Sequence, residues 1–467
     1  MIYDRLENFA SDLAVVDQGG GRYTYGQLAE AADAFAANLD HGRKNLVFIL
    51  CANNFESLVA YVGTLRSDNT AALIAANTNS ELLSNLHNLY RPDYVWRRKT
   101  DDGKFIHSCL SYGLETSGVR RDRSIHPDIA LLLSTSGSTG SPKMVRLTKR
   151  NLDSNAASIA EYLKLDATER PITSLPMHYS YGLSVVNSHL KVGATILLTD
   201  DSIVTRPFWD FFQAQSATSF AGVPYTYEML RRFGLYDMPL PSLRTMTQAG
   251  GKLTPKYALE MAEFAARKAI DFFIMYGQTE ATARISYLPL RDNREKYRSI
   301  GLAIPGGRLS LIDAQGETVT TPGVDGELVY NGPNVMLGYA EHENDLVRGD
   351  ELKGELRTGD IAQFDSDGYF YITGRRKRFI KLFGNRVNLD EIEHYLKAEG
   401  FSCACGGTDD LLCVAITDLD RAADARGAIT RKFGFHHSAV KVMEVDEIPK
   451  SSSGKIQYEQ VFKTVSP

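Results

Sequence analysis

The sequence predicts an α/β protein: a large N-terminal domain of α/β sheets with a β-rich subdomain, followed by a small mobile C-terminal α/β domain. Helical and strand patterns alternate through most of the 467 residues, which is typical of sheets covered by helices. Short strands with Gly and Pro turns replace this alternation between Arg308 and Tyr330. A chain of this length exceeds the size at which one core keeps growing, so we expect more than one domain.

Two amphipathic helices are predicted, one near residues 24–39 and one near residues 152–163. The first begins at a possible capping box formed by Thr24 and Gln27. Its apolar residues lie on one helical face: Leu28, Ala32, Phe35 and Leu39. The second helix shows the same spacing: Leu152, Ala156, Ile159 and Leu163.

The loop TSGSTGSPK, residues 135–143, directly follows an apolar run from Ile129 to Leu133. A buried strand that ends in glycines, hydroxyls and a lysine is suited to wrap phosphate oxygens. Gly137, Gly140 and Lys143 are each three residues apart, so the spacing excludes a Walker loop. Because the second helix follows, we expect strand, loop and helix to form a βα unit. A flexible surface turn is the alternative interpretation of so many Ser, Thr and Gly residues.

A second buried strand is predicted at residues 269–275, AIDFFIM, and it also ends in a polar turn, residues 276–280. Ligands of open α/β sheets gather at the carboxyl ends of strands. The two turns are therefore candidates for one shared site.

A boundary is predicted near residues 374–378, where the chain becomes strongly basic. We expect domains at 1–376 and 377–467. In the second, Asn388 and Glu391 are placed to cap a helix that carries Ile392 and Leu396. LLCVAIT and VKVMEV read as its strands.

Composition excludes several classes of protein. A net charge of −5 offers no general basic surface for nucleic acid. No window of about 18 uncharged apolar residues is present, and the first seven residues lack the order of a signal peptide, so we expect a cytoplasmic protein without a membrane span. The five cysteines are scattered and fit neither redox nor zinc spacing, which favours reduced, structural thiols.

Five motifs occur in order: TSGSTGSPK at 135–143, YGQTE at 276–280, RTGD at 357–360, GRRKRFIKLFGNRV at 374–387 and SGK at 453–455. Their order and spacing resemble those of the adenylate-forming superfamily, which contains acyl-CoA synthetases, peptide-synthetase adenylation domains and firefly luciferase. The resemblance covers nearly the whole chain. It implies that a carboxylate attacks the α-phosphate of ATP to give an acyl-adenylate and pyrophosphate. A thiol, from coenzyme A or a carrier protein's phosphopantetheine, then displaces AMP.

The resemblance also implies which residues bind ATP and Mg²⁺. Those expected at the β- and γ-phosphates are Thr135, Ser136, Gly137, Ser138, Thr139, Gly140 and Lys143. Those expected at the adenine, ribose and α-phosphate are Gly250, Gly251, Tyr276, Gly277, Thr279, Asp360 and Arg375. Glu280 matches the metal-associated glutamate of the family, and a carboxylate suits the hard Mg²⁺ ion. For Asp360, turn capping is the alternative, because Thr-Gly-Asp is also good turn chemistry.

Three lysines near the C-terminus match catalytic or hinge positions of the family. Lys455 is expected to sit between the substrate carboxylate and the α-phosphate, where negative charges must meet. Lys377 stands at the hinge position, and Lys381 matches a lysine that some members use in the second step. A solvated charged linker is the alternative for the basic run.

The sequence defines the acid-binding pocket less precisely than the ATP site. In PMHYSYGL, either His178 or Tyr179 is the candidate to guide the carboxylate, since the histidine falls one place early. Further pocket residues implied by the resemblance are Phe220, Gly222, Val223 and Met275. Residues 176–190 contain no Asp or Glu to pair with a substrate ammonium, which favours an acid without an α-amine. An amino-acid-activating ligase and a non-catalytic nucleotide- or acyl-binding module remain alternatives. No segment reads as a carrier domain, so we expect a separate acceptor.

Overall fold

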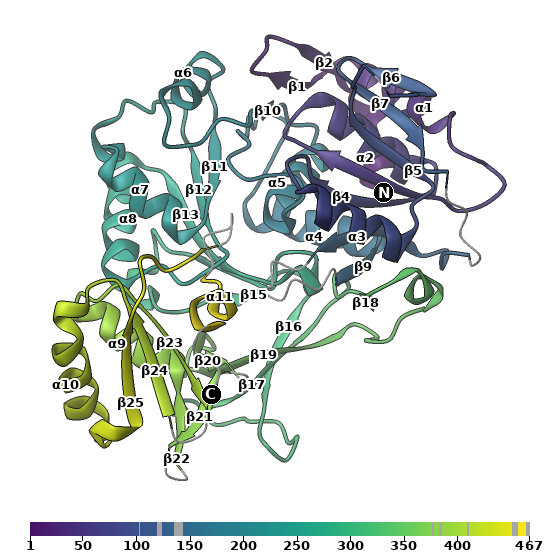
Figure 1. The fold of residues 1–467 in the computed structure, drawn as a ribbon. Coiled ribbons are helices and arrows are strands. Elements are labelled where there is room, and N and C mark those ends of the chain that lie inside the picture. The colour runs from purple at the N-terminus through teal and green to yellow at the C-terminus, as the bar shows by residue number, and fades with distance from the viewer. Residues whose placement is uncertain are drawn as a thin grey trace. The chain divides into compact units, whose positions relative to one another are not determined.

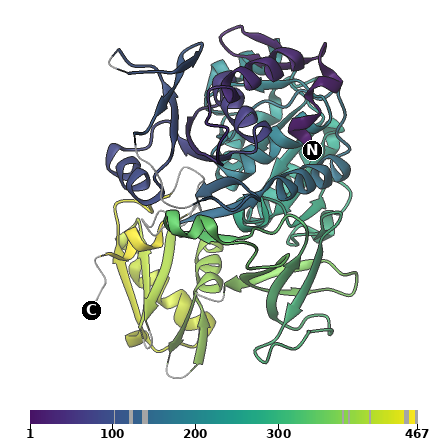
Figure 2. The ribbon, with the colours of Figure 1, turned by 90° about the vertical axis from the view of Figure 1, so that its right-hand side faces the viewer.

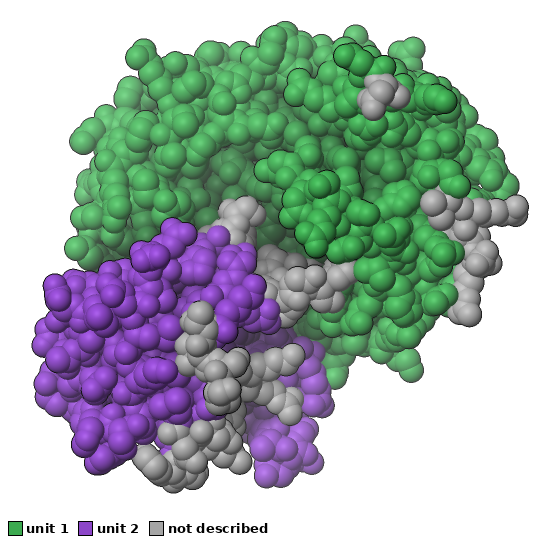
Figure 3. Space-filling model, viewed as in Figure 1, with its two compact units in different colours: residues 1–135, 141–308, 330–356 green, residues 136–140, 309–329, 357–467 purple. Residues whose placement is uncertain are grey.

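A computed structural model describes residues 1–101, 103–118, 124–134, 143–375, 378–382, 385–408, 411–450 and 456–463. They fall into two compact units, which Figure 3 colours separately. Unit 1 comprises residues 1–135, 141–308 and 330–356, and unit 2 comprises residues 136–140, 309–329 and 357–467. The expected division into domains at residues 1–376 and 377–467 stays a prediction.

Unit 1 is built on an eight-stranded sheet with the order β18-β9-β8-β4-β3-β5-β7-β6. Its strands are β3 (Leu46–Cys51), β4 (Thr70–Ala75), β5 (Tyr94–Arg98), β6 (His107–Cys109), β7 (Tyr112–Thr116), β8 (Ile129–Ser134), β9 (Met144–Thr148) and β18 (Gly338–Ala340). The four central strands β8, β4, β3 and β5 are parallel, and antiparallel strands extend the sheet on both sides. Alternation along β3 sends Val47 and Ile49 into one apolar cluster and Phe48 and Leu50 into another. The sheet is therefore buried on both faces, as parallel sheets require.

Unit 1 contains two further sheets. The first has the order β11-β12-β13-β14-β15, with β11 (Ser219–Gly222), β12 (Thr245–Gln248) and β13 (Asp271–Tyr276) parallel and β14 (Ser286–Pro289) and β15 (Leu302–Ala303) antiparallel. The other has the order β10-β1-β2, with β10 (Ile196–Leu198), β1 (Leu13–Asp17) and β2 (Arg22–Thr24).

Eight α-helices are described in unit 1 and labelled in Figure 1: α1 (Tyr25–Ala36), α2 (Phe55–Arg66), α3 (Ser80–Tyr90), α4 (Lys149–Tyr162), α5 (Ser180–Lys191), α6 (Arg206–Ala214), α7 (Pro224–Arg232) and α8 (Pro255–Lys268). Residues of α1, α2, α4 and α5 share one apolar cluster with the eight-stranded sheet, and residues of α3 pack on its other face. The predicted capping box of α1 is confirmed, since Gln27 N–H donates to the Thr24 hydroxyl and the Gln27 amide oxygen accepts from Thr24 N–H. No helix among the described residues is long and apolar enough to cross a bilayer.

The expected βα unit around the glycine-rich loop is wrong. Between β8 and helix α4 the chain forms β9, which pairs antiparallel with β8. The segment MVRLT contains Arg146, and a charged residue at its centre argues against a buried strand when only the sequence is known. Arg146 is fully buried because its guanidinium pairs with Glu351 and donates to the Arg348 carbonyl, both distant in sequence. The loop therefore joins two antiparallel strands, and α4 starts afterwards at a Thr148 capping box.

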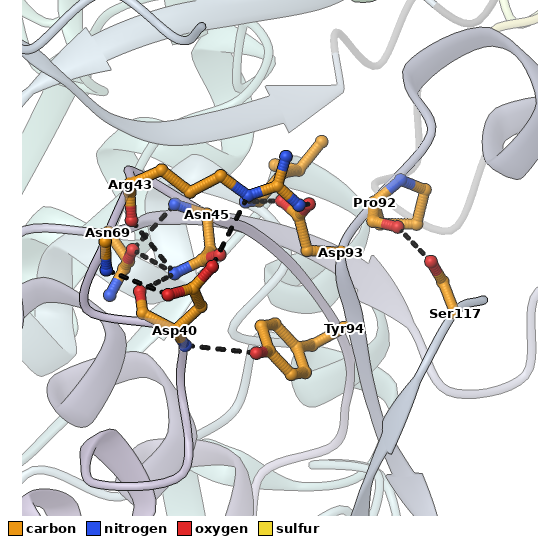
Figure 4. Close-up of polar contacts among 10 residues, drawn as sticks. Asp40, Arg43, Asn45, Asn69, Pro92, Asp93, Tyr94 and Ser117 are labelled. Carbon is orange, nitrogen blue, oxygen red and sulfur yellow. Dashed lines mark hydrogen bonds and ion pairs between the residues drawn. The ribbon is translucent and has the colours of Figure 1, made fainter. Parts of the chain in front are cut away.

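Buried polar side chains fix the beginnings of β3, β4 and β5, as Figure 4 shows. The Asn69 amide oxygen accepts from the backbone N–H of Asn45 at 2.7 Å and from its side-chain amide at 2.9 Å. Asp93 accepts from the backbone N–H of Leu46 at 2.7 Å and pairs with Arg43. These contacts lie at the amino ends of the parallel strands, the edge opposite to that where ligands bind, which indicates a structural role.

Asn69→Ala is expected to lower the free energy of unfolding by about 1–3 kcal/mol, because it leaves the buried backbone N–H of Asn45 without its acceptor. Denaturant unfolding of the purified chain measures this change. Asn77→Ala, at an exposed position before α3, is the control and is expected to change stability by less than about 0.5 kcal/mol. Equal unfolding free energies for the two variants would contradict the structural role of Asn69.

Unit 2 holds most of the β-rich region as a four-stranded sheet, β16-β17-β19-β20. Its strands are β16 (Arg308–Ile312), β17 (Gly326–Asn331), β19 (Glu355–Phe364) and β20 (Phe370–Arg375). Two smaller sheets follow: β21 (Phe379–Leu382) with β22 (Asn385–Asn388), and β23 (Cys403–Thr408), β24 (Leu411–Ile416) and β25 (Val440–Glu444). The expected strands in LLCVAIT and VKVMEV are confirmed as β24 and β25.

Helices cover both faces of the β23-β24-β25 sheet. On one face lie α9 (Leu389–Ala398) and α10 (Ala422–Phe433), whose apolar residues share a cluster with Cys403, Cys405 and Val414. Figure 2 shows this yellow-green region from a second side. On the other face, α11 (Tyr458–Phe462) packs through Val461 and Phe462 against Ala404 and Ala415. All five cysteines of the chain are free thiols, as expected.

Candidate active site

Some predicted site residues lie outside the described residues: Thr135, Ser136, Gly137, Ser138, Thr139, Gly140, Lys377 and Lys455. Lys381 is a residue of β21, paired with Arg386, and its side chain is likewise outside the description.

Three segments of unit 1 meet around Tyr339. Lys143, directly before β9, places its Nζ 3.5 Å from the centroid of the Tyr339 ring. The Tyr339 hydroxyl donates to Oε1 of Glu280 at 2.8 Å. Burial, and then the charge of Glu280, raises the pKa of the Tyr339 hydroxyl, which thus stays a donor. One tyrosine on β18 therefore positions both the cation and the carboxylate that the motifs single out.

The YGQTE motif begins at Tyr276, the last residue of β13. Glu280 and Thr279 lie in a short 3-10 helix, Thr279–Ala281. A Cβ on Gly277 would lie 1.6 Å from the carbonyl oxygen of Ala283, so this position accepts only glycine. The hydroxyls of Thr279 and Ser180 are 3.1 Å apart and hydrogen-bonded, which ties the turn to the first residue of α5. Tyr276 is half-buried, and its hydroxyl accepts from the Gln278 amide at 3.2 Å.

Gly250 and Tyr179 come together at the carboxyl end of β12. Gly250 has a φ of +84°, and a Cβ there would lie 2.7 Å from the Tyr179 hydroxyl and 3.1 Å from Val223. The glycine therefore makes room for the tyrosine. Burial lowers the pKa of His178, the charge of Asp200 opposes this shift, and the Nδ1 atom of His178 has no partner among the described residues.

The remaining predicted pocket residues differ in their surroundings. Met275 is buried, and its sulfur accepts from the Tyr162 hydroxyl at 3.0 Å. Phe220 packs its ring against Trp209 and Tyr227. Gly222 leaves room for Tyr227 and Thr226, and Gly251 accepts from the Gln248 amide at 2.9 Å.

Asp360 and Arg375 face each other in unit 2. They are register partners on β19 and β20, and Nε of Arg375 lies 3.0 Å from Oδ1 of Asp360. The Asp360 side chain is 4% exposed and that of Arg375 is 58% exposed. The RTGD motif lies inside a strand rather than a turn, with Gly359 at a φ of +73°. The two residues expected to bind the ribose thus form one polar pair.

A β-bridge and hydrogen bonds fix the residues on either side of Lys455 within unit 2. Lys450 and Ile456 form a β-bridge, and the Gln457 N–H donates to the Pro449 carbonyl at 2.9 Å. Tyr458 donates to the buried carboxylate of Glu393 at 3.1 Å, while its ring lies 3.7 Å from the Arg378 guanidinium. Arg378 follows the predicted hinge position, and it also pairs with Glu393 at 3.0 Å. One buried carboxylate therefore links the segment after Lys455 to the residue after Lys377.

Several site residues were missed by reasoning from sequence: Ser180, Tyr181, Arg284 and Tyr339. Each is an ordinary residue type whose importance comes from a contact distant in sequence. Tyr339 lies 59 residues from Glu280, and Ser180 lies 99 residues from Thr279. Only the position of Arg284, four residues after Glu280, offered a signal.

Metal binding by a preformed cluster is not indicated: no three His, Cys, Asp or Glu side chains in the described part of the chain group to hold an ion. Mg²⁺ needs no such cluster, because it keeps water and substrate phosphates among its ligands and takes one or two carboxylates. Glu280 is half-buried and fixed by Tyr339, so its chemistry fits this ion.

Known structures share this fold. The o-succinylbenzoate CoA synthetase (MenE) of Bacillus subtilis, solved in complex with its acyl-adenylate intermediate, superimposes with a TM-score of 0.79 over 98% of this chain and 97% of that chain, at 20% sequence identity. The predicted fold class is thereby confirmed.

Sequence comparisons establish the family. The model of the AMP-binding enzymes matches residues 2–340. The indoleacetate–CoA ligase of Aromatoleum aromaticum is 30% identical over 76% of this chain and 71% of its own length. A probable CoA ligase of Humulus lupulus is 27% identical over 71% of this chain and 65% of its own length. The chain belongs to the AMP-binding enzyme family.

Proposed function

We propose that this chain is an AMP-forming acid–thiol ligase. It activates a carboxylic acid with ATP to an acyl-adenylate, releases pyrophosphate, and transfers the acyl group to a thiol with release of AMP. The observation that carries this proposal is the meeting of Lys143, Tyr339 and Glu280 at the carboxyl end of β13. These segments supply a cation and a carboxylate for the phosphates and Mg²⁺ of ATP.

In the first step, the chain's residues hold the leaving pyrophosphate and orient the acid. Lys143 and the loop residues 135–140 bind the β- and γ-phosphates. Thr279 contacts the α-phosphate, and its position is fixed by Ser180. Glu280 would hold Mg²⁺, which would supply positive charge against the negative charge that develops on the phosphate oxygens. Lys455 bridges the attacking carboxylate and the α-phosphate.

Gly250, Gly251, Tyr276 and Gly277 border the adenine, and the Asp360–Arg375 pair binds the ribose hydroxyls. Between the half-reactions, residues 377–467 reorient about Lys377, and Lys381 then takes part in thioester formation. The link from Arg378 through Glu393 to Tyr458 supports this part of the proposal, since it lets the hinge side and the Lys455 segment move together.

Tyr179 rather than His178 guides the acid in this proposal. The Tyr179 hydroxyl lies against Gly250, close to Val223. The remaining residues either line the pocket or pack behind its lining: Met275, Phe220 and Gly222. Without an acidic partner for an ammonium in residues 176–190, the pocket favours acids that lack an α-amine.

Coenzyme A is the favoured acceptor, because both relatives described above are named as CoA ligases. A discrete carrier protein is the alternative. The free thiols and the need for ATP and a reduced thiol favour a cytoplasmic location.

The test is acid-dependent exchange of pyrophosphate with ATP, screened over aliphatic, aromatic and dicarboxylic acids and amino acids. We expect exchange without thiol for a subset of non-amino acids, and AMP release with thioester only when coenzyme A is added. Exchange with amino acids alone would establish the amino-acid-activating alternative. Tight ATP binding with no exchange for any acid would establish a non-catalytic module.

Asp360→Ala is expected to weaken ATP binding about 10- to 100-fold, because charge-assisted hydrogen bonds to the ribose are lost. The sharper readout is discrimination: wild type is expected to favour ATP over 2′,3′-dideoxy-ATP, and the variant to bind both alike. Asp367→Ala, in the exposed turn between β19 and β20, is the matched control. Undiminished discrimination in Asp360→Ala would remove Asp360 from the ribose site.

A further inference from the structure

Arg284 is a buried cation for which the described residues provide no acidic partner. Its residue is 2% exposed, and its Nε has no hydrogen-bond partner among the described residues. No carboxylate in the described part of the chain forms an ion pair with it. Arg146, which is likewise buried in unit 1, pairs with Glu351. An ion buried without a partner is costly, so Arg284 calls for an explanation.

Tyrosines, not acids, surround the guanidinium. Its central carbon lies 3.9 Å from the centroid of the Tyr181 ring, and the Tyr181 hydroxyl donates to Thr247 on β12 at 2.9 Å. Burial raises the pKa values of Tyr162, Tyr179 and Tyr181, and the positive charge of Arg284 opposes the rise in all three. Neutral tyrosines stabilise a guanidinium through their ring faces and oxygens, but they do not neutralise its charge.

These tyrosines belong to the proposed acid pocket. Tyr179 lies against Gly250, its ring is 6.2 Å from that of Tyr181, and Tyr162 donates to the sulfur of Met275. The cation therefore lies in the group of side chains where the acid is expected to bind, on the same turn as Glu280.

The backbone directly before Arg284 adopts an unfavourable conformation. The two residues before Arg284 have positive φ values: Thr282 at 61° and Ala283 at 131°. Such values are unfavourable for residues other than glycine, and above all for a β-branched one. Asn334 holds the turn in place, because its amide donates to the carbonyls of Ala281 at 2.7 Å and of Arg284 at 2.9 Å. Thr282 in turn donates to the Asn334 carbonyl at 2.6 Å.

We propose that Arg284 determines substrate specificity by pairing with a second carboxylate, so that the acid activated by this chain is a dicarboxylic acid. This inference rests on the proposed function and names the substrate class of the same pocket. One carboxylate meets the α-phosphate, and the other receives paired hydrogen bonds from the guanidinium fork. A monocarboxylic acid of the same length places an apolar end against an unpaired cation.

The experiment compares pairs of mono- and dicarboxylic acids of equal chain length, in the exchange assay and by calorimetric binding to the full chain. Wild type is expected to prefer the diacid by about 10²-fold or more in kcat/KM. Arg284→Met is expected to remove that preference. Arg298→Met, at an exposed arginine after β14, is the matched control and is expected to retain it. Equal use of both acids by wild type, or an unchanged preference in Arg284→Met, would overturn the proposal.

Measurements of thermal stability and of diacid binding separate a failure of this proposal from a failure of the ligase function. Because Arg284→Met removes an unpaired buried charge, its thermal midpoint without ligand is expected to equal or exceed that of wild type, and the diacid is expected to raise only the wild-type midpoint. A variant that fails to fold would show a structural cation and overturn the proposal. If no acid supports exchange but wild type binds the diacid and Arg284→Met does not, the ligase function fails and the role of Arg284 stands. If the diacid does not bind at all, both fail.

Discussion

Lys455→Ala is expected to slow acyl-adenylate formation by about 10²–10³-fold or more, because the charge that screens carboxylate from phosphate is lost. Thioester formation from a supplied acyl-adenylate is expected to change far less. By then the phosphoryl chemistry is complete, and in the proposed mechanism the C-terminal residues have reoriented. The two rates are measured separately, by pyrophosphate exchange and by consumption of synthetic acyl-adenylate with coenzyme A.

Lys463→Ala is the control for this variant. Lys463 is exposed and lies just after α11, so its loss changes net charge equally without touching the proposed catalytic position. Its rates are expected to match wild type in both assays. Equal loss of both half-reactions in Lys455→Ala would refute the assignment, since it would indicate damage to the fold or a role common to both steps.

Glu280→Gln is expected to lower the adenylation rate by about 10²-fold, because the carboxylate that holds Mg²⁺ becomes neutral. The amide oxygen of glutamine still accepts from the Tyr339 hydroxyl, so this substitution removes charge and leaves the hydrogen bond. A titration of rate against Mg²⁺ is expected to shift to higher concentration.

Tyr339→Phe is the complementary change, because it keeps the carboxylate and the aromatic ring below Lys143 but removes the hydrogen bond. Its effect is expected to be smaller, about 10-fold, with little change in the Mg²⁺ midpoint. If the Glu280→Gln variant kept the wild-type Mg²⁺ dependence, the assignment of Glu280 as the Mg²⁺ ligand would be wrong.

Structural features that depend on a few neighbouring residues were predicted correctly. The capping box of α1 and the strand β13 follow from patterns a few residues long. Strand β9 was missed, because the burial of Arg146 depends on Glu351, 205 residues away. A charge in the middle of a short segment argues against a buried strand unless its partner is known.

The site shows the same limit. Glu280 and Lys143 stand in motifs with a characteristic spacing, so their proximity to a common tyrosine agrees with the role expected for them. Tyr339 itself carries no signal, because only the pairing of β18 with β9 brings it there. For Arg284 the only signal in the sequence is its position four residues after Glu280, and its burial could not be predicted because an arginine is normally exposed.

The central claim, activation through an acyl-adenylate, is tested most directly by a single turnover with ATP labelled at the α-phosphate, in the presence of the accepted acid and without thiol. We expect the label to appear in an enzyme-bound acyl-adenylate, which coenzyme A converts to labelled AMP and unlabelled thioester. Label that appears in ADP, or in AMP without an acyl-adenylate preceding it, would rule out this mechanism.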